Sequence, residues 1–270
     1  GNALVVHAEQ LLQENKSREA YAYLNVARGQ GSGEAYRVTA DMYQQGRGVR
    51  PDPSMFKHMS WMGAQHGDPE SMFRTAQDFY DHGYRKDGEY WAKAAHACGH
   101  GGALMLLFER SVADKRDADA RHYLEMGIDA GIPAAKFALA EQYDKGGLGL
   151  PKEPQRAFYW YTESAKHGEP KAMAAIAYSF FVGSHGVKDE MAAIHWYHKA
   201  ARAGHVESMT AYGWMLANGR GTQVDKAEAM HYLQKAKAAG NLAAAKFIAE
   251  IKQNHKSASV MQKESDGNLL

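Results

Sequence analysis

The chain has 270 residues, of which 45% are hydrophobic, so it is long enough to bury a sizeable core. Its formal net charge of +1 argues against a nucleic-acid-binding protein, because such proteins carry a strong basic excess on one face. No segment approaches the roughly 18 consecutive apolar residues of a membrane-spanning helix. The single cysteine, Cys98, has no partner for an internal disulfide.

The start of the chain bears on its compartment. The sequence opens with Gly1-Asn2-Ala3 rather than with methionine, and we interpret this start as the scar of a removed leader. A periplasmic or secreted protein is therefore slightly favoured over a cytoplasmic one.

The dominant feature of the sequence is an internal repeat marked by glycine. Seven glycines recur at intervals of 32 to 37 residues, and we call them the repeat glycines: Gly31, Gly67, Gly99, Gly131, Gly168, Gly204 and Gly240. A large side chain lies eight residues before each of them and a small one four residues before, as Trp196 and Ala200 do before Gly204. Self-similarity at this period is typical of stacked supersecondary units. The sequence therefore predicts one elongated, all-α domain built from helix pairs.

The helix pairs follow one another along the chain, beginning with a half-typical opening pair. The expected units are about 3–34, 35–70, 71–102, 103–134, 135–171, 172–207 and 208–243, and a final helix at 244–254 completes a domain of 3–254. The units 71–102 and 103–134 are shorter because residues are missing from the loop between their helices. The polar segment 255–270 is predicted to be a flexible C-terminal tail.

The second helix of each pair has a predicted buried face. Apolar residues recur 11, 8, 7, 4 and 3 positions before the repeat glycine, as in Ala193, Trp196, Tyr197, Ala200 and Ala201. These positions cover about 140° of a helix, which is the width of a face turned to a core. Small side chains let neighbouring helices approach closely, while the rings fill the space between them.

These recurring residues resemble the Sel-1-like repeat family, a relative of the tetratricopeptide repeat. The likeness covers about residues 17–252, and in one unit it is carried by Ala172, Ile176-Ala177, Phe180, Gly183, Gly186-Val187, Ala193, Trp196-Tyr197, Ala200-Ala201 and Gly204-His205. The short units depart from the pattern, because their loop glycines are reduced to Gly83 or absent. The resemblance implies a right-handed α/α superhelix (solenoid) of about seven antiparallel helix-pair repeats. It also implies a scaffold or adaptor, in bacteria often at the envelope or in host contact, and identifies no partner.

One four-residue motif suggests a catalytic serine. Ser54-Met55-Phe56-Lys57 has the Ser-x-x-Lys spacing of penicillin-binding enzymes, in which the lysine lies one helical turn from the nucleophile. Neither Lys-Thr-Gly nor Ser-Asp-Asn accompanies it. Since Ser54 falls where a helix N-cap is expected, we interpret it as a capping residue.

Metal chemistry is suggested at two places and predicted at neither. His96, Cys98 and His100 combine imidazole with thiolate, which suit zinc, but they flank a repeat glycine at a helix end and no fourth ligand is evident. His195 and His198 lack a His-Glu-x-x-His pattern. We therefore predict no catalytic residue, no cofactor and no metal, and we interpret Cys98 as a small buried residue.

Two candidate surfaces remain. The first is a ladder of imidazoles and phenols nine residues before the repeat glycines, almost opposite the predicted buried face: His58, Tyr90, His122, Tyr159, His195 and His231. We favour a solvated face for this ladder, with a partner-binding or pH-sensitive surface as the alternative.

The second surface lies on the first helices of the pairs. Ten residues after the repeat glycines, acidic and amide residues give way to two rings: Asp41, Gln77, Glu109, Glu141, Tyr178, Trp214 and Glu250. Phe181 is expected beside Tyr178, and Phe73 and Phe137 lie six residues after their repeat glycines. Exposed rings flanked by charge are typical of a peptide-binding groove. The predicted partner-binding residues are Tyr178, Phe181, Trp214, Phe137, Phe73 and Glu141, unless neighbouring helices pack over these rings.

The sequence therefore predicts a non-enzymatic scaffold or adaptor, expected to be monomeric, that binds a protein or peptide on the concave face of a solenoid. An envelope carbohydrate or peptidoglycan binder is the alternative, since exposed rings also stack on sugars. Hydrolysis of β-lactams through Ser54 is a third, less favoured hypothesis.

Overall fold

The structure is a computed structural model that describes residues 2–253. Within these residues every regular element is an α-helix. The first helices in chain order are α1 (Asn2–Gln13), α2 (Ser17–Gly29), α3 (Gly33–Gln45), α4 (Pro53–Gln65), α5 (Pro69–Asp81), α6 (Arg85–Ala97), α7 (Ala103–Ala113) and α8 (Asp117–Asp129). They are followed by α9 (Pro133–Lys145), α10 (Pro154–Ala165), α11 (Pro170–Val182), α12 (Glu190–Arg202), α13 (Val206–Asn218) and α14 (Lys226–Ala238), and residues 242–253 are again helical.

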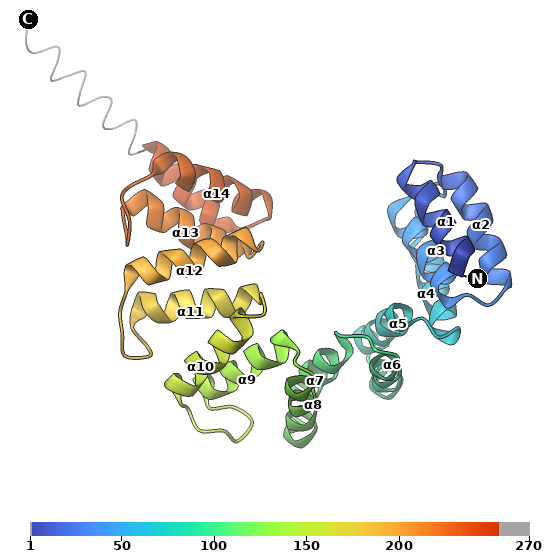
Figure 1. Cartoon of the computed structure of the whole chain (residues 1–270), viewed down its shortest axis with the longest axis horizontal. Helices are drawn as coiled ribbons and strands as arrows, with labels where there is room; N and C mark the ends of the chain where they lie inside the picture. Colours follow the sequence, from blue (N-terminus) through green and yellow to red (C-terminus); the bar gives the residue numbers. More distant parts are fainter. Residues whose placement is uncertain (1, 254–270) are drawn as a thin grey trace, which may run out of the picture. The chain divides into compact units, whose positions relative to one another are not determined.

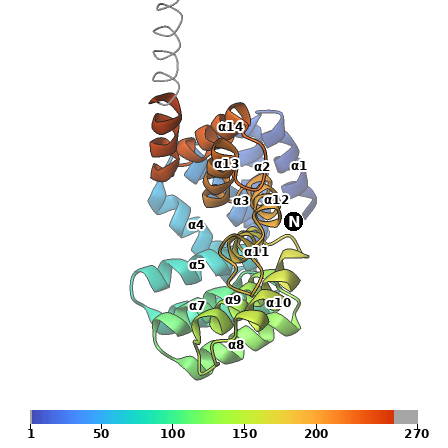
Figure 2. The same cartoon turned by 90° about the vertical axis from the view of Figure 1, so that its left-hand side faces the viewer.

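The chain divides into two compact units, and the dividing point between Gly127 and Ile128 lies within α8. We call them the N-terminal unit and the C-terminal unit. Consecutive helices pack on one another from α1 to α7 in the N-terminal unit and from α9 to α14 in the C-terminal unit, as α11 to α14 do in Figure 1. The close packing of α9 on α10 is visible in Figure 2. The predicted all-α solenoid of helix pairs is confirmed, whereas one continuous domain over 3–254 stays a prediction, and the predicted tail at 255–270 lies outside the described residues.

The repeat glycines lie in the turns that join one helix pair to the next. All seven have left-handed backbone, with φ between 73° and 93°. A side chain at such a position strains the backbone, whereas glycine adopts it freely. The turn geometry thus explains why glycine recurs, and the recurring turn sets the spacing of the helix pairs along the chain.

Small residues four positions before the repeat glycines allow neighbouring helices to approach closely. Ala27, Ala95, Ser164, Ala200 and Ala236 are fully buried at this position. At Gly63 even one added carbon would lie 2.9 Å from Ser71 Cβ and 3.2 Å from the Gly33 carbonyl oxygen. The predicted pattern of small side chains against large rings therefore describes the real helix contacts.

Two of the long loops lie against the start of an earlier helix. The long α3–α4 loop lies against the start of α2, since a carbon added to Gly48 would lie 2.7 Å from Ser17 Cβ. The α13–α14 loop lies in the same way against the start of α12, where a carbon added to Gly221 would collide with the Glu190 backbone. In the short turn between α5 and α6, a carbon added to Gly83 meets no atom within 4 Å. The short unit thus leaves the start of α4 without the covering that α2 and α12 receive.

Among residues 2–253, no helix is both long enough and apolar enough to span a bilayer.

Candidate functional site

Five of the six predicted partner-binding residues lie in the C-terminal unit, on helices that come first in their pairs. Phe137 and Glu141 are on α9, Tyr178 and Phe181 on α11, and Trp214 on α13. The sixth, Phe73 of α5, belongs to the N-terminal unit and is described with it below.

Tyr178 is the open member of this set. It is 57% exposed and lines a hollow of about 470 Å³ between α11 and α13. Tyr161 of α10 and Tyr197 of α12 also line this hollow, and Tyr161 is held in place by Phe137, whose ring centroid is 5.6 Å away. We call it the Tyr178 hollow. Its volume falls in the range of pockets that bind small ligands or single side chains.

Two carboxylates border the Tyr178 hollow. Asp144, at the end of α9, forms no ion pair with any residue of 2–253, and Glu207 of α13 is highly exposed. The hollow is also lined by His205, whose Nε2 lies 3.3 Å from Glu207 Oε2 and whose Nδ1 lies 2.8 Å from Ser208 Oγ. The hollow therefore presents rings together with unneutralised negative charge.

The phenols of the hollow respond to this environment. Burial raises the pKa of Tyr161, and the carboxylates of Asp144 and Glu141 raise it further. Burial also raises the pKa of Tyr197 to about 12, with a smaller contribution from Tyr178. Because both phenols stay neutral at ordinary pH, they offer a cation uncharged hydroxyls and ring faces rather than competing charges.

Phe181 and Trp214 form a separate contact and are not open rings. Their centroids are 6.1 Å apart in an edge-to-face arrangement. The guanidinium of Arg220 lies over both, 5.6 Å from the Phe181 centroid and 5.9 Å from that of Trp214. Glu190 holds this guanidinium through two hydrogen bonds, one of them Nε to Oε2 at 2.8 Å. The expectation that these two rings stand free beside Tyr178 therefore needs correction, because the α13–α14 loop brings Arg220 over them.

Phe137 and Glu141 support the hollow from α9. Phe137 is half-buried in the cluster that contains Tyr161. Glu141 accepts a hydrogen bond from Lys145 Nζ at 2.8 Å, one helical turn away. Of the two, Glu141 contributes charge near the hollow and Phe137 contributes packing.

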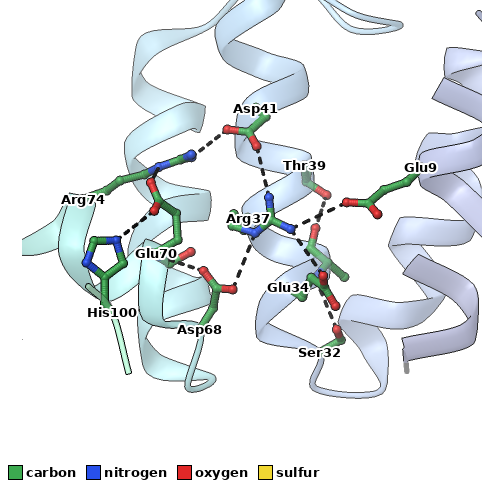
Figure 3. Close-up of polar contacts among 12 residues, drawn as sticks. Glu9, Ser32, Glu34, Arg37, Thr39, Asp41, Asp68, Glu70, Arg74 and His100 are labelled. Carbon is green, nitrogen blue, oxygen red and sulfur yellow. Dashed lines mark hydrogen bonds and ion pairs between the residues drawn. The ribbon is translucent and has the colours of Figure 1, made fainter. Parts of the chain in front are cut away.

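The matching face of the N-terminal unit is different, because its charges are paired with one another (Figure 3). Arg37 of α3 lies within 3.6 Å of carboxylate oxygens of Glu9, Glu34, Asp41 and Asp68, and it links α1, α3 and the start of α5. Several carboxylates around one guanidinium leave it no free charge for a ligand. This network therefore stabilises the stacking of helices.

Arg74 of α5 continues the network. Its Nη1 lies 2.6 Å from Asp41 Oδ1 and its Nε lies 2.9 Å from Glu70 Oε1. Burial would lower the pKa of Arg74, but the hydrogen bonds and charges of Asp41 and Glu70 outweigh it and raise that pKa. Burial would likewise raise the pKa of Glu70, but hydrogen bonds from Arg74 and His100 lower it. Both groups therefore stay charged.

Phe73 is covered within this unit. The His100 ring stacks on it with centroids 4.2 Å apart, while His100 Nε2 lies 3.0 Å from Glu70 Oε2. For this residue the alternative considered from the sequence, a ring covered by its neighbours, describes the structure.

Comparison with known proteins shows to which family the chain belongs. A sequence model of the Sel1 repeat matches residues 20–55, 133–169, 170–205 and 206–241, which together are more than half of the chain. The chain belongs to the Sel1 repeat family. Proteins of this family are generally non-catalytic scaffolds for protein interaction. The unmatched stretch between residues 55 and 133 contains both short units, in which the loop glycines are missing.

Solved structures share the Sel1 repeat fold. A Sel1 repeat protein from Oxalobacter formigenes superposes with a TM-score of 0.73 at 24% identity, covering 93% of this chain and 75% of that one. A protective antigen of uropathogenic Escherichia coli gives a TM-score of 0.63 at 25% identity, covering 84% of this chain and 50% of that one. Among curated proteins, chitin synthase regulatory factor 3 of Schizosaccharomyces pombe is 29% identical over 168 residues. That match covers 56% of this chain but only 18% of the yeast protein.

Several residues that line the Tyr178 hollow were not predicted from the sequence of the Sel1 repeats. Tyr161 and Tyr197 lie seven residues before their repeat glycines and were assigned to the buried face, yet both reach the hollow. Asp144 belongs to no column that recurs as a charge. Glu207 shares its column with Glu34 and Glu70, but that column gives no signal that the two carboxylates meet at one hollow. Their proximity depends on how α9, α11 and α13 stack.

The Ser-x-x-Lys motif has a structural explanation that differs from the one expected. Helix α4 begins at Pro53 and is capped by Asp52, whose carboxylate accepts hydrogen bonds from the Ser54 and Met55 amides at 2.9 and 3.0 Å. The prediction that Ser54 is the cap is therefore wrong. Lys57 Nζ lies 2.6 Å from Asp78 Oδ1, and a lysine held in an ion pair is a poor base for a serine.

The histidines also have local partners. No cluster of three potential metal ligands occurs in the described part of the chain, and His100 is engaged with Phe73 and Glu70. Cys98 is exposed, which corrects its predicted burial. His198 is half-buried and stacks on Tyr212 with centroids 4.6 Å apart. The ladder residues are exposed as predicted: His58, Tyr90, His122, Tyr159, His195 and His231.

Proposed function

We propose that this Sel1 repeat protein is a non-enzymatic scaffold that captures an extended, basic peptide segment of a partner protein, with a lysine or arginine side chain seated in the Tyr178 hollow. The carrying observation is the combination of an exposed ring, Tyr178, with the unpaired carboxylate of Asp144 in one hollow of side-chain size. A cation over a tyrosine face contributes about 0.5–2 kcal/mol, and a charge-assisted hydrogen bond adds to it.

The contrast between the two units supports the choice of site. In the N-terminal unit the carboxylates of the corresponding face are ion-paired with Arg37 or Arg74, whereas Asp144 has no such partner within residues 2–253. In the C-terminal unit Arg220 lies over the rings of Phe181 and Trp214, and Glu190 already holds it. The Tyr178 hollow is thus left with acceptors and ring faces that a partner's cation would satisfy.

A random-peptide display selection tests this function. We expect wild-type protein to enrich peptides with lysine or arginine beside small or apolar residues, and Tyr178→Ala to lose that enrichment. Tyr159→Ala is the matched control, because Tyr159 of α10 lies in the same unit, is 56% exposed and does not line the hollow. Selection of the same peptides by wild type and Tyr178→Ala would contradict the proposed site.

Sugar binding is the second candidate, since the exposed Tyr178 ring has the geometry for stacking on a sugar face. Sugar binding, however, gives no role to the unpaired charge of Asp144. A thermal-shift comparison of a soluble peptidoglycan fragment with a basic peptide separates the two. A rise in melting temperature with the glycan alone would favour the sugar.

A further inference from the structure

A second cavity lies in the N-terminal unit, and none of the six predicted partner-binding residues lines it. It has a volume of about 250 Å³ and lies between α4 and α5. Its apolar walls are the rings of Phe56, Trp61 and Phe79, and the hydroxyls of Ser60 and Thr75 also line it. An apolar engineered cavity of about 150 Å³ is large enough to bind benzene. This cavity therefore has room for a substituted aromatic ring.

The two hydroxyls are buried and lack partners. Ser60 is 4% exposed and Thr75 is 6% exposed, and neither Ser60 Oγ nor Thr75 Oγ1 has a hydrogen-bond partner within residues 2–253. The threonine at the corresponding place one unit earlier, Thr39, donates to the Ala35 carbonyl at 2.7 Å. Buried polar groups in folded proteins are nearly always hydrogen-bonded, so a ligand or water that reaches these hydroxyls would pair two otherwise unpaired groups.

The repeat explains why a cavity forms at this place. Seven residues before the repeat glycines the chain has Leu24, Ser60, Ala92, Leu124, Tyr161, Tyr197 and Leu233. Eight residues after them it has Thr39, Thr75, Leu107, Leu139, Ile176, Tyr212 and Ile248. Only the α4–α5 interface combines a small polar residue in the first column with a polar residue in the second. Where a tyrosine occupies the first column, as at Tyr161, it joins the cluster of the second-column residue, Ile176.

The short α5–α6 turn keeps this cavity open. The loops that contain Gly48 and Gly221 lie against the starts of α2 and α12, but a carbon at Gly83 meets nothing within 4 Å. Trp61, at the cavity rim, is 42% exposed. The cavity is therefore open to solvent beside Trp61.

The charges at the rim are already paired, which favours a neutral ligand. Lys57 and Asp78 lie 2.6 Å apart, and Arg74 is engaged by Asp41 and Glu70. Aromatic walls with two hydroxyls and no free charge fit a ring that carries a single hydroxyl, which both donates and accepts a hydrogen bond.

We propose that the α4–α5 cavity binds a phenol, in the place that tyrosine side chains fill at two other interfaces of the same chain. The phenol ring packs between Phe56, Trp61 and Phe79, and its hydroxyl bonds to Ser60 and Thr75. The phenol is either a free small molecule or a tyrosine side chain presented by a partner.

Titration of the full chain with p-cresol, followed by amide NMR, tests this proposal. Saturable shifts are expected at α4 and α5 with a Kd of about 1 mM, and binding of toluene is expected to be roughly tenfold weaker because it leaves the hydroxyls unpaired. Ser60→Leu introduces the leucine that other units carry at the corresponding position, as Leu24 and Leu233. Its side chain fills the cavity and should abolish binding. Thr75→Val keeps the volume and should remove the preference for p-cresol over toluene.

The same titration with the peptide Gly-Gly-Tyr-Gly-Gly separates the two sources of the phenol. Binding of both probes assigns a partner's tyrosine, and binding of p-cresol alone assigns a free phenol. Absence of saturable shifts in wild type, or equal p-cresol binding by wild type and Ser60→Leu, would overturn the site. If Ser60→Leu does not fold, equal preference for p-cresol in wild type and Thr75→Val overturns it instead.

Discussion

Replacing Gly63 with alanine tests whether small residues at the helix contacts determine the stability of the stack. Two effects oppose each other in Gly63→Ala. Alanine favours a helix interior over glycine by about 1 kcal/mol, whereas overpacking a filled interface costs about 1–3 kcal/mol. The new carbon would lie 2.9 Å from Ser71 Cβ and 3.2 Å from the Gly33 carbonyl oxygen. Neither of these atoms moves away by a side-chain rotation, so the cost falls in the upper part of its range.

We therefore expect Gly63→Ala to destabilise the protein by about 1–2 kcal/mol. Gly29→Ala is the matched control, because Gly29 is also helical but a carbon added there meets no atom within 4 Å. It should be neutral or stabilising by up to about 1 kcal/mol. Adding Ser71→Gly to Gly63→Ala should recover at least half of the lost stability. Urea unfolding followed by circular dichroism at 222 nm measures all of these variants, and a shift of Gly63→Ala and Gly29→Ala in the same direction would refute the reasoning.

Three further predictions follow from single side chains. Burial raises the pKa of Tyr80 to about 12, so the stability that its neutral form contributes is complete below pH 10 and is lost between pH 10 and 12. Melting temperatures measured across this pH range should therefore fall less for Tyr80→Phe than for wild type. Arg220→Ala should uncover Phe181 and Trp214 and shift tryptophan emission to the red. Arg220→Lys should shift it too, because lysine cannot make the two-point contact with Glu190, and an unchanged spectrum would contradict the described contact. Ala200→Leu should cost about 1–3 kcal/mol in urea unfolding, since Ala200 is fully buried, and an unchanged midpoint would show that its register is wrong.

The repeat made the helix pairs predictable, because each pair must bury the same stripe against the next. Trp196, Ala200 and Gly204 report a large ring, a close contact and a left-handed turn, and these three requirements recur at fixed spacing. The division within α8 was not predictable, since no column of the repeat changes there in a way that signals it.

The candidate site was only partly predictable, for reasons that lie outside the repeat columns. Tyr178 and Trp214 occupy the same column, but only Trp214 lies under an arginine, and that arginine comes from a loop whose path the column does not specify. The capping of α4 was misassigned because Asp52 and Ser54 both have side chains that cap helices. Choosing between them requires knowing that Pro53 is the first helical residue.

The most direct test of the central claim is the affinity of one peptide for the Tyr178 hollow. A short peptide with a single arginine is titrated against wild type, Tyr178→Ala, Asp144→Asn and the double variant, and the same peptide with norleucine in place of arginine is the control. We predict that each single substitution weakens binding about 5- to 30-fold, that the double variant loses less than the product of the two, and that the norleucine peptide binds all four proteins weakly. Equal affinity of wild type and Tyr178→Ala for the arginine peptide, or equal affinity of wild type for both peptides, would contradict the account.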